Sequence, residues 1–461
     1  MLPTQVSTKR TSLFLISCLP AGRLIPFFLF LILLNSCSIQ KEIARSAKED
    51  VLGTKALQAA HVGISIFDPA ENKYLYNYQG DKYFVPASNT KLPTCYAAMK
   101  YLGDSLVGAR VATGEQGSLL VFPAGDPSFL NPEFKFQPVF REMKKYNTIV
   151  VYTDAWKEER WGSGWSWNDY DAAYMAERSA FPVYGNVIQF YLSGDTLKSI
   201  PSATIAGAHQ TLGYDKDANT VTIKKFSIGR GIDDDGFFLK PSSSTFSTTA
   251  IPLRSDMSLV TGFLEDTLKA EITPASMEHG FSINPVKRII HSQPTDSLLK
   301  PMMHRSDNFF AEQSLLMVSN ERLGYMSDEK IIDTLLKTDF KDLPQKPRWA
   351  DGSGLSRYNL FTPQDLVAIL NKMKNEFGMD RIKVILATGG EGTISSYYKA
   401  DSGYIYGKTG TLSGVVAFSG YLYTKKGKLL IFSTLVNNST SSATDVRRAI
   451  EKFLQSIRNR Y

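Results

Sequence analysis

The chain has 461 residues, of which 43% are hydrophobic and 21% charged, a composition typical of a globular protein with two or three domains. The formal net charge of +7 includes Lys9, Arg10 and Arg23, which lie in the first 36 residues without an acidic neighbour, so the rest of the chain holds 49 basic against 45 acidic side chains. So small and dispersed a positive excess gives no support to a nucleic-acid-binding function.

The N-terminal segment predicts export. Leu24–Leu34 is an apolar run of signal-peptide length, shorter than the roughly 20 residues of a membrane-spanning helix. It leads into Leu34-Asn35-Ser36-Cys37, which resembles the lipobox of bacterial lipoproteins, in which the cysteine carries the lipid. We therefore expect residues 1–36 to be a signal peptide, and the mature protein to be periplasmic and held to a bacterial membrane, the outer one, through Cys37.

An uncleaved anchor formed by residues 12–34 is the alternative, although Arg23 interrupts it. Cysteine usage agrees with export followed by lipidation. Once Cys18 has been removed with the signal peptide and Cys37 carries lipid, Cys95 remains alone, with no partner for a disulfide. We expect Cys95 to be a buried helix residue and not a catalytic thiol.

The next segments predict a tether, a hairpin and a helix. Residues 37–53 are polar and charged, as in a tether or a first helix. His61–Asp68 and Lys73–Tyr78 are β-rich runs separated by a short turn sequence, a pattern typical of a hairpin. In the stretch FVPASNTKLPTCYAAMKYLG, residues 84–103, Gly103 stands where a helix would end. Apolar residues recur there at helical spacing: Leu92, Cys95, Tyr96, Met99 and Leu102.

The middle of the chain, residues 106–249, differs from the rest in composition and periodicity. Short β-like runs such as SLLVFPAGDPSF and NTIVVYTD alternate with Gly, Ser, Asp and Pro, and helical periodicity is scarce. We interpret this region as a β-rich insertion that returns through the sequence KPSSSTFSTTA, residues 240–250. An amphipathic helix over residues 251–268 is then expected to resume the first domain.

The C-terminal part repeats the pattern of the beginning. Residues 414–424 and 428–438 flank a short turn and predict a second hairpin. A closing helix follows, and Ser442 and Asp445 are spaced like a capping box at its start. Strands at both ends of the chain with helices between them predict an α+β fold, whose main domain is built from residues 54–105 and 250–461 around one sheet.

Ser88 and Lys91 are the first candidates for chemistry. A serine hydroxyl is a weak nucleophile at neutral pH and needs a base beside it. Lysine serves as that base when burial or a neighbouring cation lowers its pKa, and residues three apart share one face of a helix. The pattern is not specific by itself, because Ser297 and Lys300 form a second copy in a probable helix.

Two further motifs distinguish the first copy. Ser306-Asp307-Asn308 follows Ser88 after about 220 residues, and Lys408-Thr409-Gly410-Thr411 follows about 100 residues later, immediately before the predicted hairpin. Alone, the first would be a helix cap and the second a plain turn. S-x-x-K, S-D-N and K-T-G in this order are the serine set of penicillin-binding proteins and β-lactamases.

With these motifs the sequence resembles the D-alanyl-D-alanine carboxypeptidase/endopeptidase family of class C penicillin-binding proteins. The likeness covers nearly everything after residue 53 and includes VPASNTKL, AGDPSF, GWSWND, SDNFFAEQSL, DGSGLSRYNLFTP and YGKTGTLSGVVAFSGYLY. It implies a penicillin-binding, transpeptidase-like domain with a large insertion between the first two motifs. It also implies that the substrates are peptidoglycan stem peptides and that β-lactams are covalent inhibitors, without a metal or cofactor.

The resemblance implies a role for each motif. Ser88 attacks the carbonyl of the penultimate D-alanine while Lys91 takes its proton, and backbone N–H groups of Ser88 and Thr411 form the oxyanion hole. Ser306 with Lys408 passes a proton to the leaving amine, and Asn308 holds the substrate's peptide amide. The terminal carboxylate would lie against the third motif: Lys408, Thr409, Gly410 and Thr411.

Two further positions are carried over from the family. Asp169 in WSWND and Arg357 in DGSGLSR match an acid and an arginine that bind the free amino-acid end of a diaminopimelate side chain. Opposite charges suit such a zwitterion, although an ordinary surface pair would give the same pattern. Pro93 departs from the family, and we expect it to be tolerated in the first turn of the helix, where the missing donor matters less.

Three alternatives remain open. A β-lactamase would share the three motifs, although the insertion and the DGSGLSR segment favour a cell-wall peptidase. A catalytically inactive, peptidoglycan-binding lipoprotein is the second, but all the motif residues are present. Other hydrolases are disfavoured because the chain contains no G-x-S-x-G, and none of its five histidines has the H-E-x-x-H or H-x-x-E-H context of a zinc peptidase.

Overall fold

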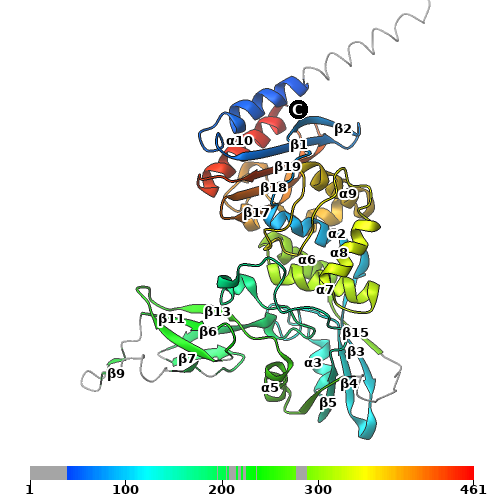
Figure 1. Cartoon of the computed structure of the whole chain (residues 1–461), viewed down its shortest axis with the longest axis vertical. Helices are drawn as coiled ribbons and strands as arrows, with labels where there is room; N and C mark the ends of the chain where they lie inside the picture. The colour runs from blue at the N-terminus through cyan, green and yellow to red at the C-terminus, as the bar shows by residue number, and fades with distance from the viewer. Residues whose placement is uncertain are drawn as a thin grey trace, which may run out of the picture.

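The computed structural model describes residues 39–194, 196–203, 205–206, 214–215, 220–221, 225–234, 236–276 and 288–460. The predicted signal peptide and Cys37 lie outside them. Along the long axis of the molecule, a sheet covered by helices is followed by a helical layer and then by a β-rich region (Figure 1). In the part of the chain described, no helix is long and apolar enough to span a bilayer.

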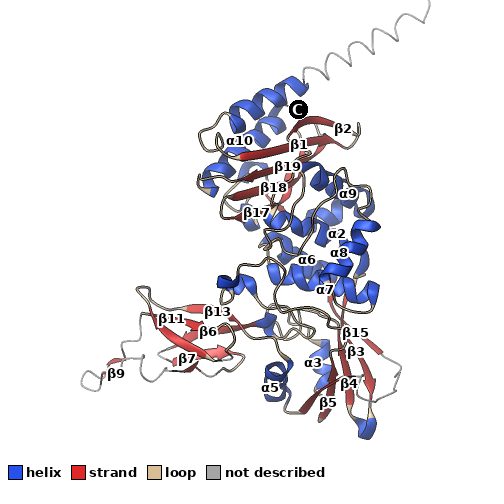
Figure 2. Ribbon diagram, viewed as in Figure 1, coloured by secondary structure: helices blue, strands red, loops and turns tan. Residues whose placement is uncertain are grey.

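Both ends of the chain contribute to one antiparallel sheet of six strands, as predicted. The strand order is β16-β17-β18-β19-β1-β2, and the two termini meet where β1 pairs with β19, with Ile64 opposite Thr434. The strands are β1 (His61–Asp68), β2 (Lys73–Tyr78), β16 (Ala387–Thr388), β17 (Ile405–Leu412), β18 (Val415–Tyr423) and β19 (Leu429–Asn437). The central strands carry near-continuous apolar runs because both faces of the sheet are covered by helices (Figure 2).

One face of the sheet is covered by the two terminal helical segments, which lie side by side (Figure 1). Residues 39–47 and the π-helical turn Lys48–Leu52 pack against α10 (Ala443–Arg460), with Ile43, Ala47 and Val51 fully buried. Polar contacts join them as well: Lys452 pairs with Asp50 at 3.0 Å. Of the two options for residues 37–53, a tether is therefore wrong from residue 39 onward, because three buried apolar residues one helical turn apart tie this segment to the core.

The other face carries the larger core, built from five helices: α2 (Lys91–Tyr101), α6 (Thr295–His304), α7 (Asn308–Leu323), α8 (Asp328–Lys337) and α9 (Pro363–Ile385). The apolar positions predicted for α2 are all buried, and Cys95 is a fully buried, free thiol. Helix α2 is buried from Lys91 to Met99, where α7, α9 and α6 contact it. Pro93 lies in its first turn, where a backbone N–H would have no partner within the helix, so the donor that proline lacks is not missed.

The insertion consists of a mixed sheet and smaller β units (Figure 1). The mixed sheet has the order β14-β5-β4-β3-β15 and packs on α3 (Pro138–Met143) and α5 (Met257–Leu268). Its strands are β3 (Ser105–Thr113), β4 (Leu119–Pro123), β5 (Thr148–Tyr152), β14 (Glu271–Ala275) and β15 (Arg288–Pro294). The smaller units are β6 (Val187–Ser193), β7 (Thr196–Ile200) and β13 (Thr248–Pro252); β11 (Phe226–Arg230), β12 (Phe237–Pro241) and β8 (Ile205–Ala206); and β9 (Tyr214–Asp215) with β10 (Thr220–Val221).

The predicted end of the insertion is wrong. Residues 251–252 close strand β13, and α5 begins only at Met257. Val260 and Leu264 of α5 pack on the insertion's core, beside Ile149 of β5, and the following strand β14 pairs with β5. The chain therefore returns to the peptidase domain at α6, because an amphipathic pattern specifies that a helix has a buried face but not which core it joins.

Candidate active site

Ser88 lies on a tight turn that precedes α2. The turn is a 3-10 helix, Ala87–Thr90, and Ala87 enters it with φ 47°, a conformation that is strained for a residue with a side chain. The α-helix itself begins only at Lys91. The 3-10 geometry eclipses side chains three residues apart, and Lys91 Nζ lies 3.1 Å from Ser88 Oγ.

Lys91 is completely buried, and its pKa lies below that of an exposed lysine. Its Nζ donates to Asn308 Oδ1 at 2.6 Å and to the carbonyl of Ser353 at 2.7 Å. Burial lowers the pKa of Lys91 to about 8, although nearby carboxylates oppose this effect. Those carboxylates are Asp351, Glu312 and Asp307. About one tenth of the amine is therefore neutral at pH 7, and this neutral form can act as a general base.

The second and third motifs meet beside this pair. Lys408, on β17, is fully buried, and its Nζ donates to Ser306 Oγ and to the carbonyl of Thr409, each at 2.8 Å. Burial, followed by the positive charges of Lys91 and Arg447, holds the pKa of Lys408 well below its usual value. Ser306 adopts φ 65°, so the backbone bends sharply just before α7.

Two glycines allow the segments around Ser88 to approach one another closely. A Cβ on Gly410 would lie 2.7 Å from the Pro86 carbonyl and 3.0 Å from the Ser88 nitrogen, which shows how near β17 passes to the nucleophile turn. A Cβ on Gly354, which has φ 86°, would lie 2.0 Å from the Ala87 carbonyl oxygen. Both positions therefore require glycine.

A cavity of about 930 Å³ opens over Ser88 Oγ. The motif and substrate positions predicted from the sequence that line it are Ser88, Ser306, Asn308, Thr409, Thr411, Asp169 and Arg357. Lys91 and Lys408 lie beneath the surface and reach it only through the hydroxyls they contact. The structure thus brings the three motifs and the two positions from distant loops to one groove, which is the size expected for a small-molecule or peptide site.

The two loop positions, Asp169 and Arg357, each have a different neighbour in the groove. Asp169 is the last residue of a short 3-10 turn in the insertion, Trp167–Asp169, and is hydrogen-bonded to the Tyr174 hydroxyl; burial and then the charge of Asp169 raise the pKa of that hydroxyl. Arg357 donates to the carbonyl of Ser413, just beyond the third motif, at 2.9 Å. Both polar atoms of the Asn308 side chain have protein partners: its Oδ1 accepts from Lys91, and its Nδ2 donates to the Tyr174 carbonyl at 2.9 Å.

Sequence reasoning missed a line of buried charges behind Lys91. The Ser353 N–H donates to Glu312 Oε1 at 2.7 Å, and the other oxygen of Glu312 lies 3.6 Å from Arg178. Burial, and then the charge of Asp351, raise the pKa of Glu312 to about 8. An acid in the middle of a buried helix, in AEQS, was the available signal, because such residues are rarely buried without a partner.

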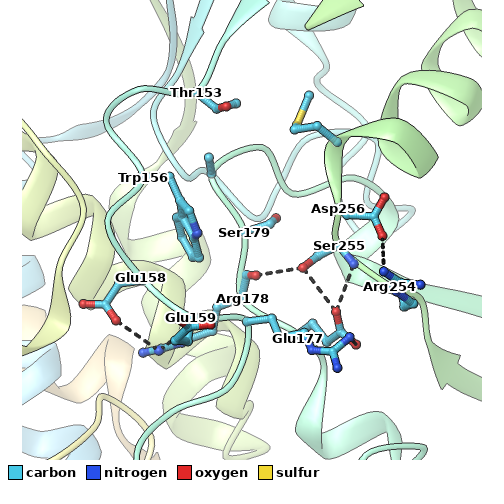
Figure 3. Close-up of a pocket in the computed structure, with 13 residues that line it drawn as sticks. Thr153, Trp156, Glu158, Glu159, Glu177, Arg178, Ser179, Arg254, Ser255 and Asp256 are labelled. Atoms are coloured by element: carbon cyan, nitrogen blue, oxygen red, sulfur yellow. Dashed lines mark hydrogen bonds and ion pairs between the residues drawn. The ribbon is translucent and has the colours of Figure 1, made fainter. Parts of the chain in front are cut away.

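Arg178 comes from the insertion and connects it to the peptidase domain. It pairs with Asp328 and Glu158, and it donates to the carbonyls of Glu159 and Trp161. Figure 3 shows it on the floor of a cavity of about 310 Å³, with the Glu158 carboxylate on one side. Within this cavity Arg254 pairs with Asp256, and the Ser255 N–H donates to Glu177, while Arg178 also reaches Glu312 of α7 and Asp328 of α8. The cluster therefore fixes the position of the insertion against α7 and α8.

The chain is similar to known proteins over most of its length. A model of the D-Ala-D-Ala carboxypeptidase 3 (S13) family matches residues 45–457. The chain is 23% identical to the D-alanyl-D-alanine carboxypeptidase DacB of Haemophilus influenzae over 457 residues, which cover 89% of this chain and 92% of that protein. It is 26% identical to the D-alanyl-D-alanine carboxypeptidase of Actinomadura sp. over 439 residues, with coverage of 85% and 80%.

Solved structures agree with this assignment of the fold. The crystal structure of penicillin-binding protein 4 (DacB) from Haemophilus influenzae matches with a TM-score of 0.68 at 19% identity, covering 90% of this chain and 98% of that one. A predatory peptidoglycan endopeptidase from Bdellovibrio bacteriovorus matches with a TM-score of 0.50 at 14% identity, with coverage of 86% and 92%. The resemblance inferred from the motifs is confirmed: the chain belongs to the D-Ala-D-Ala carboxypeptidase 3 (S13) family of serine peptidases.

Proposed function

We propose that this protein is a D,D-peptidase that uses Ser88 as its nucleophile against peptidoglycan stem peptides ending in D-Ala-D-Ala, or against their cross-links. The observation that carries the proposal is the contact of 3.1 Å between Ser88 Oγ and the buried amine of Lys91. A serine beside a base with a pKa of about 8, at the bottom of an open groove, is arranged for acyl transfer. Membership of the carboxypeptidase family supports the choice of substrate.

The reaction begins with formation of an acyl-enzyme. Ser88 Oγ attacks the carbonyl carbon of the penultimate D-alanine, and its proton passes to the neutral amine of Lys91. Asn308 and the Ser353 carbonyl, which accept hydrogen bonds from Lys91, hold the amine toward the nucleophile. The oxyanion is assigned to the backbone N–H groups of Ser88 and Thr411, each worth about 2.7–4 kcal/mol in comparable sites.

Release of the leaving group needs a proton on its nitrogen. Ser306 Oγ lies at the groove and is hydrogen-bonded to Lys408 Nζ, so the Ser306 hydroxyl donates to the amine as the C–N bond breaks and recovers a proton from the lysines behind it. Water then hydrolyses the ester and regenerates Ser88. A β-lactam follows the same first step, but its leaving amine stays tethered and the acyl-enzyme persists.

Asp169 and Arg357 are proposed to bind the amino-acid end of a diaminopimelate side chain. Both line the groove with Ser88, and their opposite charges match the ammonium and carboxylate of that zwitterion. Binding of the substrate's peptide amide by Asn308 stays a prediction, since both polar atoms of its side chain already have protein partners.

Labelling with fluorescent penicillin tests the nucleophile. The native protein should give a covalent band that Ser88→Ala abolishes. Ser297→Ala is the matched control, because Ser297 begins the second S-x-x-K and is exposed on α6, away from the groove. Labelling of both serine variants, or loss of labelling in Ser297→Ala alone, would refute the assignment of Ser88.

Digestion of purified muropeptides then separates the remaining functions. Release of free D-alanine from pentapeptides indicates carboxypeptidase activity, and conversion of dimers to monomers indicates cross-link endopeptidase activity. Rapid turnover of penicillin would instead favour a β-lactamase, and binding of muropeptides without products would favour an inactive binding protein. A long-lived penicilloyl adduct with cleavage of either peptide supports the proposal.

We also propose that the protein is exported to the periplasm and lipidated at Cys37. The apolar run and the lipobox-like sequence before Cys37 support this. Cys37→Ser should shift the protein from the membrane fraction to the soluble one and remove the lipid mass from its N-terminal peptide. Equal partition of both forms would refute lipidation.

A further inference from the structure

Arg447 places a guanidinium in the groove that no motif accounts for. It lies on the first turns of α10, and its Nη2 donates to the hydroxyl of Thr411 at 2.6 Å. Arg447 lines the same cavity as Ser88, Thr409 and Thr411. Its side chain is therefore aimed at the part of the groove that belongs to the third motif.

Within the described part of the chain, the guanidinium of Arg447 lies over the Tyr397 ring, 5.8 Å from its centroid, and has no acidic partner. Among the described residues no carboxylate lies within ion-pair distance of it, and its Nε is buried without a hydrogen bond. The next residue on the same helix behaves differently, because Arg448 pairs with Glu451 and donates to the Ser396 carbonyl. A partly buried cation that is left unpaired is costly unless a ligand completes it.

Among the described residues, Arg357 also has no acidic partner, but of the cations near the third motif only Arg447 donates to the Thr411 hydroxyl. Lys408 is buried beneath Thr409 and is hydrogen-bonded to Ser306, and the low pKa of its amine makes it a poor permanent charge. Arg357 donates to the Ser413 carbonyl. A carboxylate that enters the groove beside Thr409 and Thr411 therefore meets Arg447 as its fixed positive charge, and a guanidinium can bind both carboxylate oxygens at once.

We propose that Arg447 is a substrate-binding residue that receives the free α-carboxylate on the far side of the scissile bond, together with the hydroxyls of Thr409 and Thr411. The inference rests on the proposed function and adds Arg447 to its substrate-binding residues. The carboxylate belongs to a terminal D-alanine or to the D-centre of a cross-linking diamino acid. Capping that carboxylate as an amide removes the charge that Arg447 binds.

The test compares two substrates with two variants. The substrates are a short peptide that ends in D-Ala-D-Ala and the same peptide as its C-terminal amide. We expect Arg447→Gln to lower kcat/KM for the free acid by about 10- to 100-fold, the typical effect of losing a hydrogen bond to a charged group. For the amide, kcat/KM should change by less than about threefold, because the lost interaction is with a charge that the amide lacks. Arg448→Gln is the matched control and should leave both substrates unaffected.

The outcomes separate this inference from the proposed function. If the native enzyme cleaves neither peptide and is not labelled by penicillin, the proposed function fails. If the native enzyme is active and Arg447→Gln loses the same factor on both substrates, or on neither, the carboxylate role is refuted. Should Arg447→Gln not fold, Arg447→Lys keeps the charge and must still show a loss confined to the free acid; an equal loss on both substrates overturns the inference there as well.

Discussion

The protonation state of Lys91 predicts how the acylation rate depends on pH. With a pKa of about 8, roughly one tenth of the Lys91 amine is neutral at pH 7 and about nine tenths at pH 9. Because only the neutral amine accepts the proton of Ser88, the second-order rate constant for acylation should rise about tenfold between these pH values and then level off. If Lys91 had the ordinary pKa of a lysine, the rate constant for acylation would still be rising steeply at pH 9.

Substitution of Glu312 tests how the structure sets this dependence of the acylation rate on pH. Glu312 lies one hydrogen bond behind Ser353, and its negative charge, like that of Asp351, opposes the effect of burial and raises the pKa of Lys91. Its own pKa is raised to about 8, so Glu312 ionises over the same range and makes Lys91 hold its proton more tightly as the pH rises. The native profile should therefore be broader than a single titration.

Glu312→Gln should move the midpoint of the profile to lower pH and narrow it to a single titration. Glutamine keeps the oxygen that accepts from the Ser353 N–H, so the carbonyl that orients Lys91 stays in place while the charge is lost. The assay is the rate of labelling by a fluorescent penicillin from pH 6 to 10 at constant ionic strength. Tryptophan fluorescence of each sample is the control that the protein stays folded.

Two results would refute this reasoning. A native profile that is flat or falls between pH 7 and 9 would show that a neutral Lys91 does not limit acylation. A midpoint that moves upward in Glu312→Gln would show that the carboxylate does not raise the pKa of Lys91.

Three further predictions follow from particular contacts. Gly354→Ala should lower the unfolding free energy by more than about 1 kcal/mol and slow acylation, because its Cβ would lie 2.0 Å from the Ala87 carbonyl oxygen at φ 86°; urea unfolding and penicillin labelling measure both effects. Arg178→Met leaves its buried acidic partners uncompensated and should cost about 3–5 kcal/mol, seen as a lower urea midpoint, whereas an unchanged midpoint would contradict the pairing. Asp169→Asn and Arg357→Gln should each reduce cleavage of diaminopimelate-containing peptides by about 10-fold or more, while penicillin acylation changes by less than about twofold; parallel losses in both assays would contradict a role in binding that side chain.

The parts of the fold that could be predicted are those that depend on local pattern. The strands 61–68 and 73–78 are separated by a turn sequence and alternate or run apolar as strands do, and their pairing is as expected. Ser442 also caps the last helix, with the Asp445 N–H donating to Ser442 Oγ at 3.1 Å. Each of these features is settled within 18 residues of sequence.

The errors in the fold concern tertiary choices. Residues 39–47 have few strongly apolar positions, and only docking against α10 turns Ile43 and Ala47 into core. Helix α5 was recognisable as a helix, but its membership of the insertion depends on Ile149, more than 100 residues earlier in the chain. A periodic pattern carries no information on such distant partners.

The same division applies to the site. Ser88 and Lys91 are three residues apart, so their contact follows from local geometry once the turn forms. The support behind Lys91 was not predictable, because Ser353 and Glu312 are brought together only when α7 packs against the loop between α8 and α9. Arg447 was missed because a single arginine in a charged helix looks like a solvent-exposed residue until the sheet edge is placed beside it.

The contact between the Asn89 side chain and the Lys408 carbonyl joins residues 319 positions apart. The turn bearing the nucleophile is therefore made early on the ribosome, whereas the edge that completes it is among the last parts to be synthesised. A nascent chain that ends before β17 has a serine but no Lys408 behind Ser306, and closing so long a loop makes maturation of the groove a late and slow event. Reaction with penicillin should therefore report that the chain has finished folding, because the Ser88 hydroxyl becomes reactive only when both ends of the chain have come together.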